Sequence, residues 1–511
     1  MDQRRMVVHT PETERAPAWE LWLHSLALAA ALVLIFVVAT STNPAVDFWW
    51  QLRTGERIVR TGAIPYTDLF SWTAHGDPWL VQEWLTEVLF FLLWEHTPHW
   101  SFVLYKAGLA TLACGLVMKR CEGRGVGFWL ILGAGLLTAW GIRPFSDLRP
   151  QMITFAFAAL LLWRLDAYRE RGGPLPWLLP PWFLIWANLH AGVIVGFLLL
   201  GAWIAGDLAE RWYRRQNYAG VRLLLLGGAA AAVAAMVNPN GYHLYTYPLK
   251  VLGHPQVMGF IREWLSPNFH LWWYRPFEAA LLGSVVVVGL LRRPRWCDLA
   301  LLLMLGHMAL FSARNTPLFV VAAAPAVAEG AAALVAGLAQ RVRWADLHAS
   351  VRAAAHAVFG SGVIVLVGVL IWVGTPPRPP AEWFDWIVDT AYFPVEGARR
   401  LKQGEWPGRL YNDYSWGGYL IWHAYPERPV FIDGRAEVYY ESNTFDDEYK
   451  LFHIRQGWKQ ALDERGVEVV LTRSNGYLGV ALSYQDEWER VFDGQVETIF
   501  VRRTPLAPRD E

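Results

Sequence analysis

The stretch Asp47-Phe-Trp-Trp-Gln-Leu-Arg-Thr-Gly55 follows an uncharged apolar run at residues 21–40, and Gly76-Asp-Pro-Trp-Leu-Val-Gln-Glu83-Trp-Leu85 lies a short way beyond it. Both stretches are acidic and rich in tryptophan, and apolar sequence borders them on either side. An apolar run of about 20 residues can cross the hydrocarbon core of a bilayer, which is roughly 30 Å thick. The sequence therefore predicts a polar loop that holds carboxylates close to one face of a membrane.

The composition of the whole chain indicates the same class. Of 511 residues, 54% are hydrophobic and 18% are charged, whereas about a quarter of the residues are charged in soluble domains. Apolar runs of spanning length predict a polytopic α-helical membrane protein of about eleven transmembrane helices, with twelve or thirteen as alternatives. We expect the helices at residues 21–40, 100–118, 126–142, 150–166, 176–190, 191–212, 221–237, 277–292, 297–312, 316–338 and 355–374. The first run is too long for the core of a secretory signal, so we interpret it as a retained helix.

Clusters of Lys and Arg set the expected orientation, because short loops rich in these residues stay on the cytoplasmic side. The clusters lie in the N-terminal segment 1–20 and at residues 119–124, 164–171, 211–222, 292–295 and 341–352. The intervening loops, the polar loop at 41–97 and the chain after residue 375 are then extracytoplasmic. Residues 79–97 are apolar, but a crossing there would reverse this pattern, so we expect a juxtamembrane or re-entrant helix.

The composition changes after residue 374. Residues 375–383 are rich in proline, which is typical of a stiff, extended linker. In residues 384–511, short helical and extended patterns follow one another. They predict a small C-terminal α/β extracytoplasmic domain after the membrane region 21–374. We expect helices at 394–404, 416–425 and 459–465, and strands at 409–412, 429–433, 467–472, 488–492 and 497–502. The formal net charge of zero gives no reason to expect a nucleic-acid partner.

Three acids in the polar loop are candidate catalytic residues. Asp47 follows Asn43-Pro44, a typical helix start, so its carboxylate can simply complement the helix dipole. Alternatively, Asp47 is a general base whose pKa is tuned by burial and by a neighbouring acid. Glu83 enters the next apolar segment, and Asp68 fits a turn as well as a catalytic role.

Cations gather on the same expected side of the membrane: Lys106, Arg143, Arg149, Arg262 and Arg314. Each of them can contact a lipid head group, but their grouping favours a bound phosphate, which the planar guanidinium group binds well. His190, in a short turn, can contact substrate or, together with Asp47, a divalent ion. No compact motif indicates a dedicated metal site, so we predict no cofactor and leave a divalent metal as an alternative.

Aromatic residues and one turn complete the candidates. Most of the 30 tryptophans are expected at the membrane interface, but Trp50 and Trp84 can also stack on a sugar. The run Phe431-Ile-Asp-Gly-Arg435 first indicates a turn after a strand. Recognition of an acceptor by Asp433 and Arg435 is the alternative.

These features together resemble the GT-C glycosyltransferases of the aminoarabinose-transferase and protein-mannosyltransferase type. They are an Asp soon after the first span, a Gly62-x-x-Pro-x-x-Asp68 turn, an acid entering the next apolar helix, and a small C-terminal outer domain. The likeness covers the architecture and roughly residues 20–170. Asp47-Phe48 stands where the family has an acidic pair, and Glu83-Trp84 stands where the family usually has Pro-Pro or Lys-Pro.

The resemblance implies an inverting transfer of a sugar from a polyprenyl-phosphate carrier to a glycan, lipid or protein acceptor, at the outer face of a bacterial inner membrane. Asp47 would be the base, and Glu83 or Asp68 would orient the acceptor or raise the pKa of Asp47. A transporter or flippase of lipid-linked glycans, and a polymerase or ligase using diphosphate donors, stay open as alternatives. Polar residues expected in mid-membrane are few, mainly His307 and Glu329, which favours surface chemistry over transport.

Overall fold

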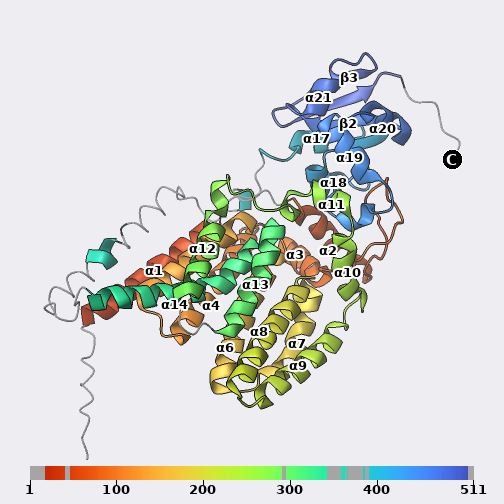
Figure 1. Ribbon diagram of the computed structural model, residues 1–511. Coiled ribbons are helices and arrows are strands. Elements are labelled where there is room, and N and C mark those ends of the chain that lie inside the picture. Colours follow the sequence, from red (N-terminus) through yellow and green to blue (C-terminus); the bar gives the residue numbers. More distant parts are fainter. Residues whose placement is uncertain are drawn as a thin grey trace, which may run out of the picture.

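Long helices make up most of the computed structural model (Figure 1). The structure describes residues 18–40, 46–290, 295–341, 358–362, 365, 382, 384–385 and 391–504. The bundle consists of α1 (Ala18–Ala39), α4 (Ser101–Gly123), α5 (Phe128–Ile142), α6 (Gln151–Arg171), α7 (Leu175–Leu189), α8 (Val193–Arg214), α9 (Ala219–Ala235), α12 (Arg275–Leu290), α13 (Trp296–Phe311) and α14 (Thr316–Arg341). The expected span at 355–374 and the linker at 375–383 lie mostly outside the described residues.

The length and apolar composition of its helices identify the bundle as a membrane domain. In the described part of the chain, five helical segments are long and apolar enough to cross a membrane by length and composition, and they contain α1, α4, α5, α8 and α14. The helices α9 and α13 are shorter but also apolar. The predicted multi-pass membrane class is therefore confirmed, while the count of about eleven spans stays a prediction.

Close helix contacts in the bundle depend on glycine. A Cβ atom at Gly206 of α8 would overlap the backbone of α13, and one at Gly227 of α9 would overlap the carbonyl group of Pro176 in α7. Small residues of this kind let transmembrane helices approach until their backbones touch. The pairs α8–α13 and α7–α9 accordingly pack tightly over their length.

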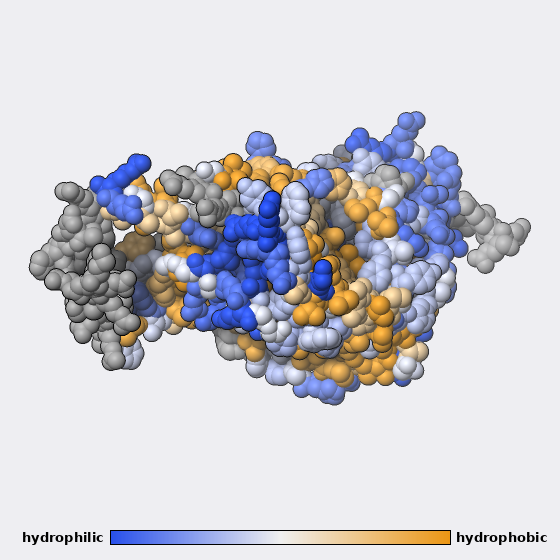
Figure 2. All heavy atoms as spheres, turned by 60° about the horizontal axis from the view of Figure 1, so that its bottom comes forward, coloured by the Kyte–Doolittle hydropathy of each residue, from blue (hydrophilic) through white to orange (hydrophobic). Residues whose placement is uncertain are grey.

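One end of the bundle, which we call the arginine end, is held by buried ion pairs. Arg120 and Arg124, near the end of α4, bind Asp166 of α6 and Asp298 of α13 at 2.8–3.1 Å. Glu329, expected in mid-membrane, lies 3.5 Å from Arg124 and belongs to this end instead. Helix ends that the charge pattern assigns to one side therefore do lie together. Figure 2 turns the lower end of Figure 1 forward, and hydrophilic residues gather across its middle beside hydrophobic surface.

The opposite end, which we call the Asp47 end, carries the polar loop. Its helices are α2 (Phe48–Thr61), α3 (Trp84–His96), α10 (His243–Leu252) and α11 (Pro255–Phe260), and they lie beside the C-terminal region (Figure 1). The helix α3 corresponds to the predicted juxtamembrane segment and packs on α2 and α7. Gly55 permits this packing, because a Cβ atom there would overlap the carbonyl oxygen of Glu87.

The C-terminal region contains a small mixed sheet, as predicted. Its elements are α17 (Val395–Lys402), β1 (Arg409–Asn412), α18 (Gly417–Ala424), α19 (Thr444–His453), α20 (Trp458–Arg465), β2 (Val467–Arg473), α21 (Tyr477–Leu482), β3 (Trp488–Asp493) and β4 (Glu497–Arg502). The strand order is β1-β2-β4-β3, in which β1 and β2 are parallel and the other pairs are antiparallel. The helices α19 and α21 were not predicted.

The strand expected at residues 429–433 is wrong. Val430 forms an isolated bridge with Ser71 of the polar loop rather than joining the sheet. The amide of Val430 donates to the carbonyl oxygen of Phe70 and that of Trp72 donates to Val430, both at 3.0 Å. The apolar pattern that predicts a strand here instead reflects burial against a distant part of the chain.

The polar loop and the C-terminal region share one hydrophobic core. Trp49 of α2 packs its ring 5.2 Å from that of Tyr419 in α18 and 6.0 Å from that of Phe393. The same core contains Phe48, Phe70, Val430 and Phe431, all nearly or fully buried. Burial of this apolar area stabilises both parts together, so each depends on the other for its packing.

Candidate functional site

One guanidinium group binds three carboxylates at the Asp47 end. Arg149, just before α6, places Nη1 3.1 Å from Oδ2 of Asp47 and Nη2 3.2 Å from Oε2 of Glu263. Its Nε lies 2.5 Å from Oδ2 of Asp147. We call Asp47, Asp147, Arg149 and Glu263 the Arg149 cluster. It contains more negative than positive charge, so its acids compete for one cation.

Asp47 is at the N-cap position of α2, but its side chain does not cap the helix. Its carboxylate instead binds Arg149 and accepts a hydrogen bond of 3.2 Å from Nε1 of Trp50. The simple helix-dipole interpretation therefore does not account for the direction of this side chain.

Burial and the neighbouring arginines together separate the pKa values of Asp47 and Glu263. It raises the pKa of Asp47 from 3.8 to about 6, and Glu263 and Asp147 add to this effect while Arg149 and Trp50 oppose it. Burial alone would also raise the pKa of Glu263, yet Arg149 and Arg314 together hold it at about 2. Two neighbouring acids with separated pKa values are typical of sites for acid–base chemistry.

Glu83, at the start of α3, is held in a second group of hydrogen bonds that includes Gln51, one turn along α2 from Asp47. Nε2 of Gln51 donates to Oε2 of Glu83 at 2.7 Å, and Nε2 of His190 lies 3.1 Å from Oε1. On the other side of the imidazole, Nδ1 accepts from the amide of Gly192 at 3.1 Å and lies 2.7 Å from Oγ1 of Thr154.

This arrangement assigns the imidazole tautomer. Nε1 of Trp186 donates to Oγ1 of Thr154 at 3.1 Å, so the threonine hydroxyl is free to donate to Nδ1 of His190. An Nδ1 atom that accepts leaves the proton on Nε2. Nε2 of His190 then donates to Oε1 of Glu83.

The C-terminal region covers Asp47. A Cβ atom at Gly434 would overlap Oδ1 of Asp47 and stand 3.2 Å from Nε1 of Trp50. The hydroxyl of Tyr414 lies 3.5 Å from the carbonyl oxygen of Gly434. Burial, followed by the charges of Asp47 and Glu263, raises the pKa of Tyr414, which places this side chain beside the Arg149 cluster as well.

Asp68 lies in a separate, fully buried junction. Its Oδ1 is 2.7 Å from Nη1 of Arg435, whose Nη2 is 2.6 Å from Oδ2 of Asp433. Asp68 also accepts hydrogen bonds from the backbone amides of Phe70 and Ser71. Both Asp433 and Arg435, considered for acceptor recognition, are 0–1% exposed. These residues therefore join the polar loop to the C-terminal region.

The predicted cations differ in position. The guanidinium group of Arg314 lies 4.3 Å from the centre of the Trp264 ring, and its charge lowers the pKa of Glu263. Burial raises the pKa of Asp147, and the charge of the buried Lys106 acts in the opposite direction, to lower it. Arg143 lies 5.1 Å from the ring of Trp272. Arg262 is exposed and lies near His453. Arg314 and Lys106 thus lie beside the acids of the Arg149 cluster, whereas Arg262 lies apart from it.

The two tryptophans proposed as sugar-stacking residues are largely engaged in the protein. Trp50 is 9% exposed and donates to Asp47. Nε1 of Trp84 donates to Oδ1 of Asn188 at 2.9 Å. Their ring nitrogens bind other residues of the site, and the rings of Trp50 and Trp79 pack edge-to-face with their centroids 6.3 Å apart.

The acids do not form a set of metal ligands. Among the described residues, no group of three or more His, Cys, Asp or Glu side chains has an arrangement that could hold a metal ion. Asp47 and Glu83 both use their carboxylate oxygens for the hydrogen bonds and ion pairs given above. The dependence on a divalent metal is therefore left as an alternative.

Several residues of the site were not predicted from the sequence. Asp147 stands between Arg143 and Arg149 in a short turn, and an acid between two arginines is a signal that could have found it. Glu263 stands next to Arg262 and Trp264 in the same way. Gly434 belongs to the run Phe431–Arg435 noted in the sequence, but no local pattern indicates that Gly434 or Tyr414 lies beside Asp47, because this relation exists only in three dimensions.

Comparison with known proteins agrees with the architecture. No protein-family model and no curated protein matches the sequence. The oligosaccharyltransferase of Archaeoglobus fulgidus, solved with a tethered acceptor peptide, matches with a TM-score of 0.53 and 12% identity, over 89% of this chain and 69% of that one. ArnT from Cupriavidus metallidurans matches with a TM-score of 0.48 and 15% identity, over 95% and 98% of the two chains. The chain therefore shares its fold with the archaeal oligosaccharyltransferase, in agreement with the resemblance noted in its sequence.

Proposed function

We propose that the protein is a membrane glycosyltransferase that moves a sugar from a polyprenyl-phosphate carrier to an acceptor at the outer face of a bacterial inner membrane. The observation that carries this proposal is the contact of Arg149 with Asp47, an acid whose pKa is raised to about 6. This contact brings a guanidinium group, the kind of cation that binds phosphate well, next to a carboxylate with a pKa suited to a base. The fold shared with the oligosaccharyltransferase supports the same reaction class.

Arg149, Arg314 and Lys106 would bind the donor phosphate. Arg314 and Lys106 lie beside the acids of the Arg149 cluster. In the structure the guanidinium group of Arg149 binds the carboxylates of Asp47, Asp147 and Glu263. A phosphate offers Arg149 a stronger bidentate partner than a single carboxylate oxygen. Binding of the donor would thus displace Asp47 from Arg149 and release it to act as a base.

The chemical step is then a single displacement. The acceptor oxygen forms a bond to the anomeric carbon, the bond from that carbon to the phosphate oxygen breaks, and the electron pair leaves with the lipid phosphate. The acceptor proton passes to Asp47, since a base with a pKa near the working pH is the most effective. Configuration at the anomeric carbon inverts. Glu83, held by His190 and Gln51, would orient the acceptor.

A transfer assay tests this proposal. Purified protein is incubated with radiolabelled polyprenyl-phosphate sugars and, separately, with polyprenyl-diphosphate glycans. We expect label to move to an acceptor from the monophosphate donor, and Asp47→Asn to lower the rate by about 10²–10⁴-fold. Asp77→Asn, an acid of the same loop outside the cluster, is the matched control. Full activity of folded Asp47→Asn would remove Asp47 as the base, and transfer from the diphosphate donor alone would favour the polymerase or ligase alternative.

A further inference from the structure

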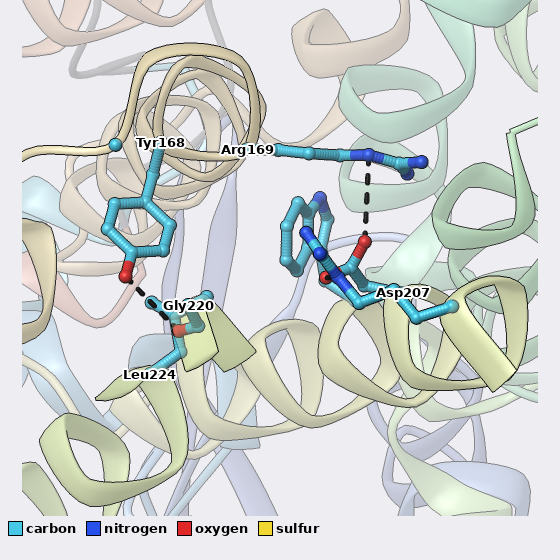
Figure 3. A pocket seen from close by; sticks show the side chains of 8 residues that line it. Tyr168, Arg169, Asp207, Gly220 and Leu224 are labelled. Atoms are coloured by element: carbon cyan, nitrogen blue, oxygen red, sulfur yellow. Dashed lines mark hydrogen bonds and ion pairs between the residues drawn. The ribbon is translucent and has the colours of Figure 1, made fainter. Parts of the chain in front are cut away.

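A cavity at the arginine end lies far from Asp47 and plays no part in the proposed reaction. Its volume is about 210 Å³. It opens between the ends of α6, α8 and α9 (Figure 3). The lining residues are Tyr168, Arg169, Gly172, Trp203, Asp207, Arg211, Gly220 and Leu224.

A buried acid and two arginines give this cavity both signs of charge. Asp207 is 1% exposed, and its Oδ2 binds Nε of Arg211 at 2.7 Å. Its Oδ1 is 3.6 Å from Nε of Arg169 and accepts no hydrogen bond within the described part of the chain. A buried carboxylate oxygen without a donor costs free energy, so a ligand that donates a hydrogen bond would be stabilised there.

Arg211 offers the complementary charge. Its Nη1 donates to the carbonyl oxygen of Asn217 at 2.7 Å, and no hydrogen bond from its Nη2 is found among the described residues. Arg169 is held by Glu210 at 2.7 Å. An anionic group in the cavity would therefore meet Nη2 of Arg211, a few ångströms from the carboxylate of Asp207.

The size and surroundings of the cavity indicate a membrane lipid. Its volume is below the roughly 300 Å³ at which pockets for drug-sized molecules begin, so only a small group fits. Trp203 and Leu224 give it apolar walls. Outside it, Trp212 and Tyr213 are 75% and 69% exposed at the end of α8, and Leu226 of α9 is 68% exposed. Exposed aromatic residues at a helix end are typical of the membrane interface.

We propose that this cavity binds the phosphoethanolamine head group of a phospholipid. The ammonium group donates to Oδ1 of Asp207, the phosphate accepts from Arg211, and the acyl chains follow the exposed leucines of α9. An ammonium group has three hydrogen-bond donors, whereas the trimethylated nitrogen of choline has none. The site therefore selects phosphatidylethanolamine over phosphatidylcholine.

Native mass spectrometry of the whole protein tests the site with defined lipids. The protein is purified with phosphatidylethanolamine, phosphatidylcholine or phosphatidylglycerol, and the lipid that it retains is counted. Soluble phosphoethanolamine serves as a competitor that lacks acyl chains. We expect phosphatidylethanolamine to be retained at least about tenfold better than phosphatidylcholine, as one hydrogen bond to a charged group provides, and the soluble competitor to have little effect.

Two variants locate the site within the cavity. Gly220→Leu fills the cavity without removing a charge, since a Cβ atom there makes only ordinary contacts with Tyr168. Ala219→Leu, an exposed neighbour outside the lining, is its control. Asp207→Asn removes the acceptor charge at constant size.

We expect Gly220→Leu and Asp207→Asn to lose the preference for phosphatidylethanolamine and Ala219→Leu to keep it. Equal retention of all three lipids by the unaltered protein, or an unchanged preference in folded Gly220→Leu, would overturn the proposal. Complete displacement of the lipid by soluble phosphoethanolamine would overturn the lipid assignment.

Discussion

Gly434 in the C-terminal region lies against Asp47 of α2, across most of the length of the chain, and leaves no room for a side chain between them. Its backbone conformation is not one that only glycine adopts easily, so the need for glycine is steric. The loop from Asp433 to Arg435 is held from behind by the buried pair of Arg435 with Asp68. Because Gly434 contacts Asp47 and Arg435 anchors the loop to Asp68, this loop is a fixed cover for the proposed base.

The Gly434→Ala variant should therefore lose most transfer activity. The added methyl group has to move either the cover or the Asp47 carboxylate, and displacements of about 1 Å at a reacting group can cost 10²-fold in rate. Gly259→Ala is a matched control, because a Cβ atom there meets nothing within 4 Å. Transfer rates and thermal unfolding of both variants check this, and a fully active Gly434→Ala protein would show that the cover moves away during turnover.

The rate of transfer should depend on pH through Asp47. A base must be ionised, and the pKa of Asp47 is raised to about 6, so the rate should fall as the pH falls through about 6. Arg149 favours the ionised form. Arg149→Gln should therefore move this acid limb to higher pH, besides weakening donor binding. Rates between pH 4 and 9 for both proteins measure the shift, and a shift to lower pH would contradict the assignment of the base.

Asp47→Asn should unfold at a higher temperature than the unaltered protein at pH 8, although it lacks activity. The folded pKa of Asp47 lies above its unfolded value of 3.8, so the ionised group destabilises the folded state by at most on the order of 3 kcal/mol at neutral pH. This cost is absent below about pH 4, grows as the pH rises from about 4 to about 6, and is constant above that. The difference in Tm between the two proteins should therefore increase between pH 4 and 8, and a constant difference would contradict the raised pKa.

Arg435→Gln should loosen the junction between the polar loop and the C-terminal region. It leaves the fully buried acids Asp68 and Asp433 without their shared cation, which typically costs about 3–5 kcal/mol. Arg490→Gln removes an exposed pair of Arg490 with Asp493 and should cost less than about 1 kcal/mol. Hydrogen exchange at residues 66–82 measures the effect, and equal protection in both variants would contradict a stabilising role for Arg435.

Local patterns in the sequence predicted most of the helices and strands but not which segments pack together. Runs of apolar residues identified the bundle, and charge clusters correctly gathered the ends of α4, α6 and α8 on one side. The strand β1 was predicted at its observed bounds, because a short extended run can be recognised from the residues within it. At Val430 the same reasoning failed, because its partner Ser71 belongs to a segment that no local pattern connects with it.

In the candidate site, too, the sequence predicted single residues but not the contacts between them. Asp47, Glu83, Arg149 and His190 were all named from the sequence, since charged residues next to apolar segments are conspicuous. Their pairing was not predictable: Glu83 binds His190 rather than Asp47. Asp68 was named for its charge, whereas its burial against Arg435 follows only from the packing of two distant segments.

The core shared by the polar loop and the C-terminal region also sets an order of assembly. During synthesis Ser71 emerges early, and its partner Val430 follows about 360 residues later, which is roughly 20 to 70 s at ordinary rates of translation. For that time Trp49 and Phe70 lack the surfaces that bury them in the finished protein. Asp47, the proposed base, is covered only after the segment that contains Gly434 has been made. A protein truncated before this segment would therefore contain the helices of the bundle but an incomplete site.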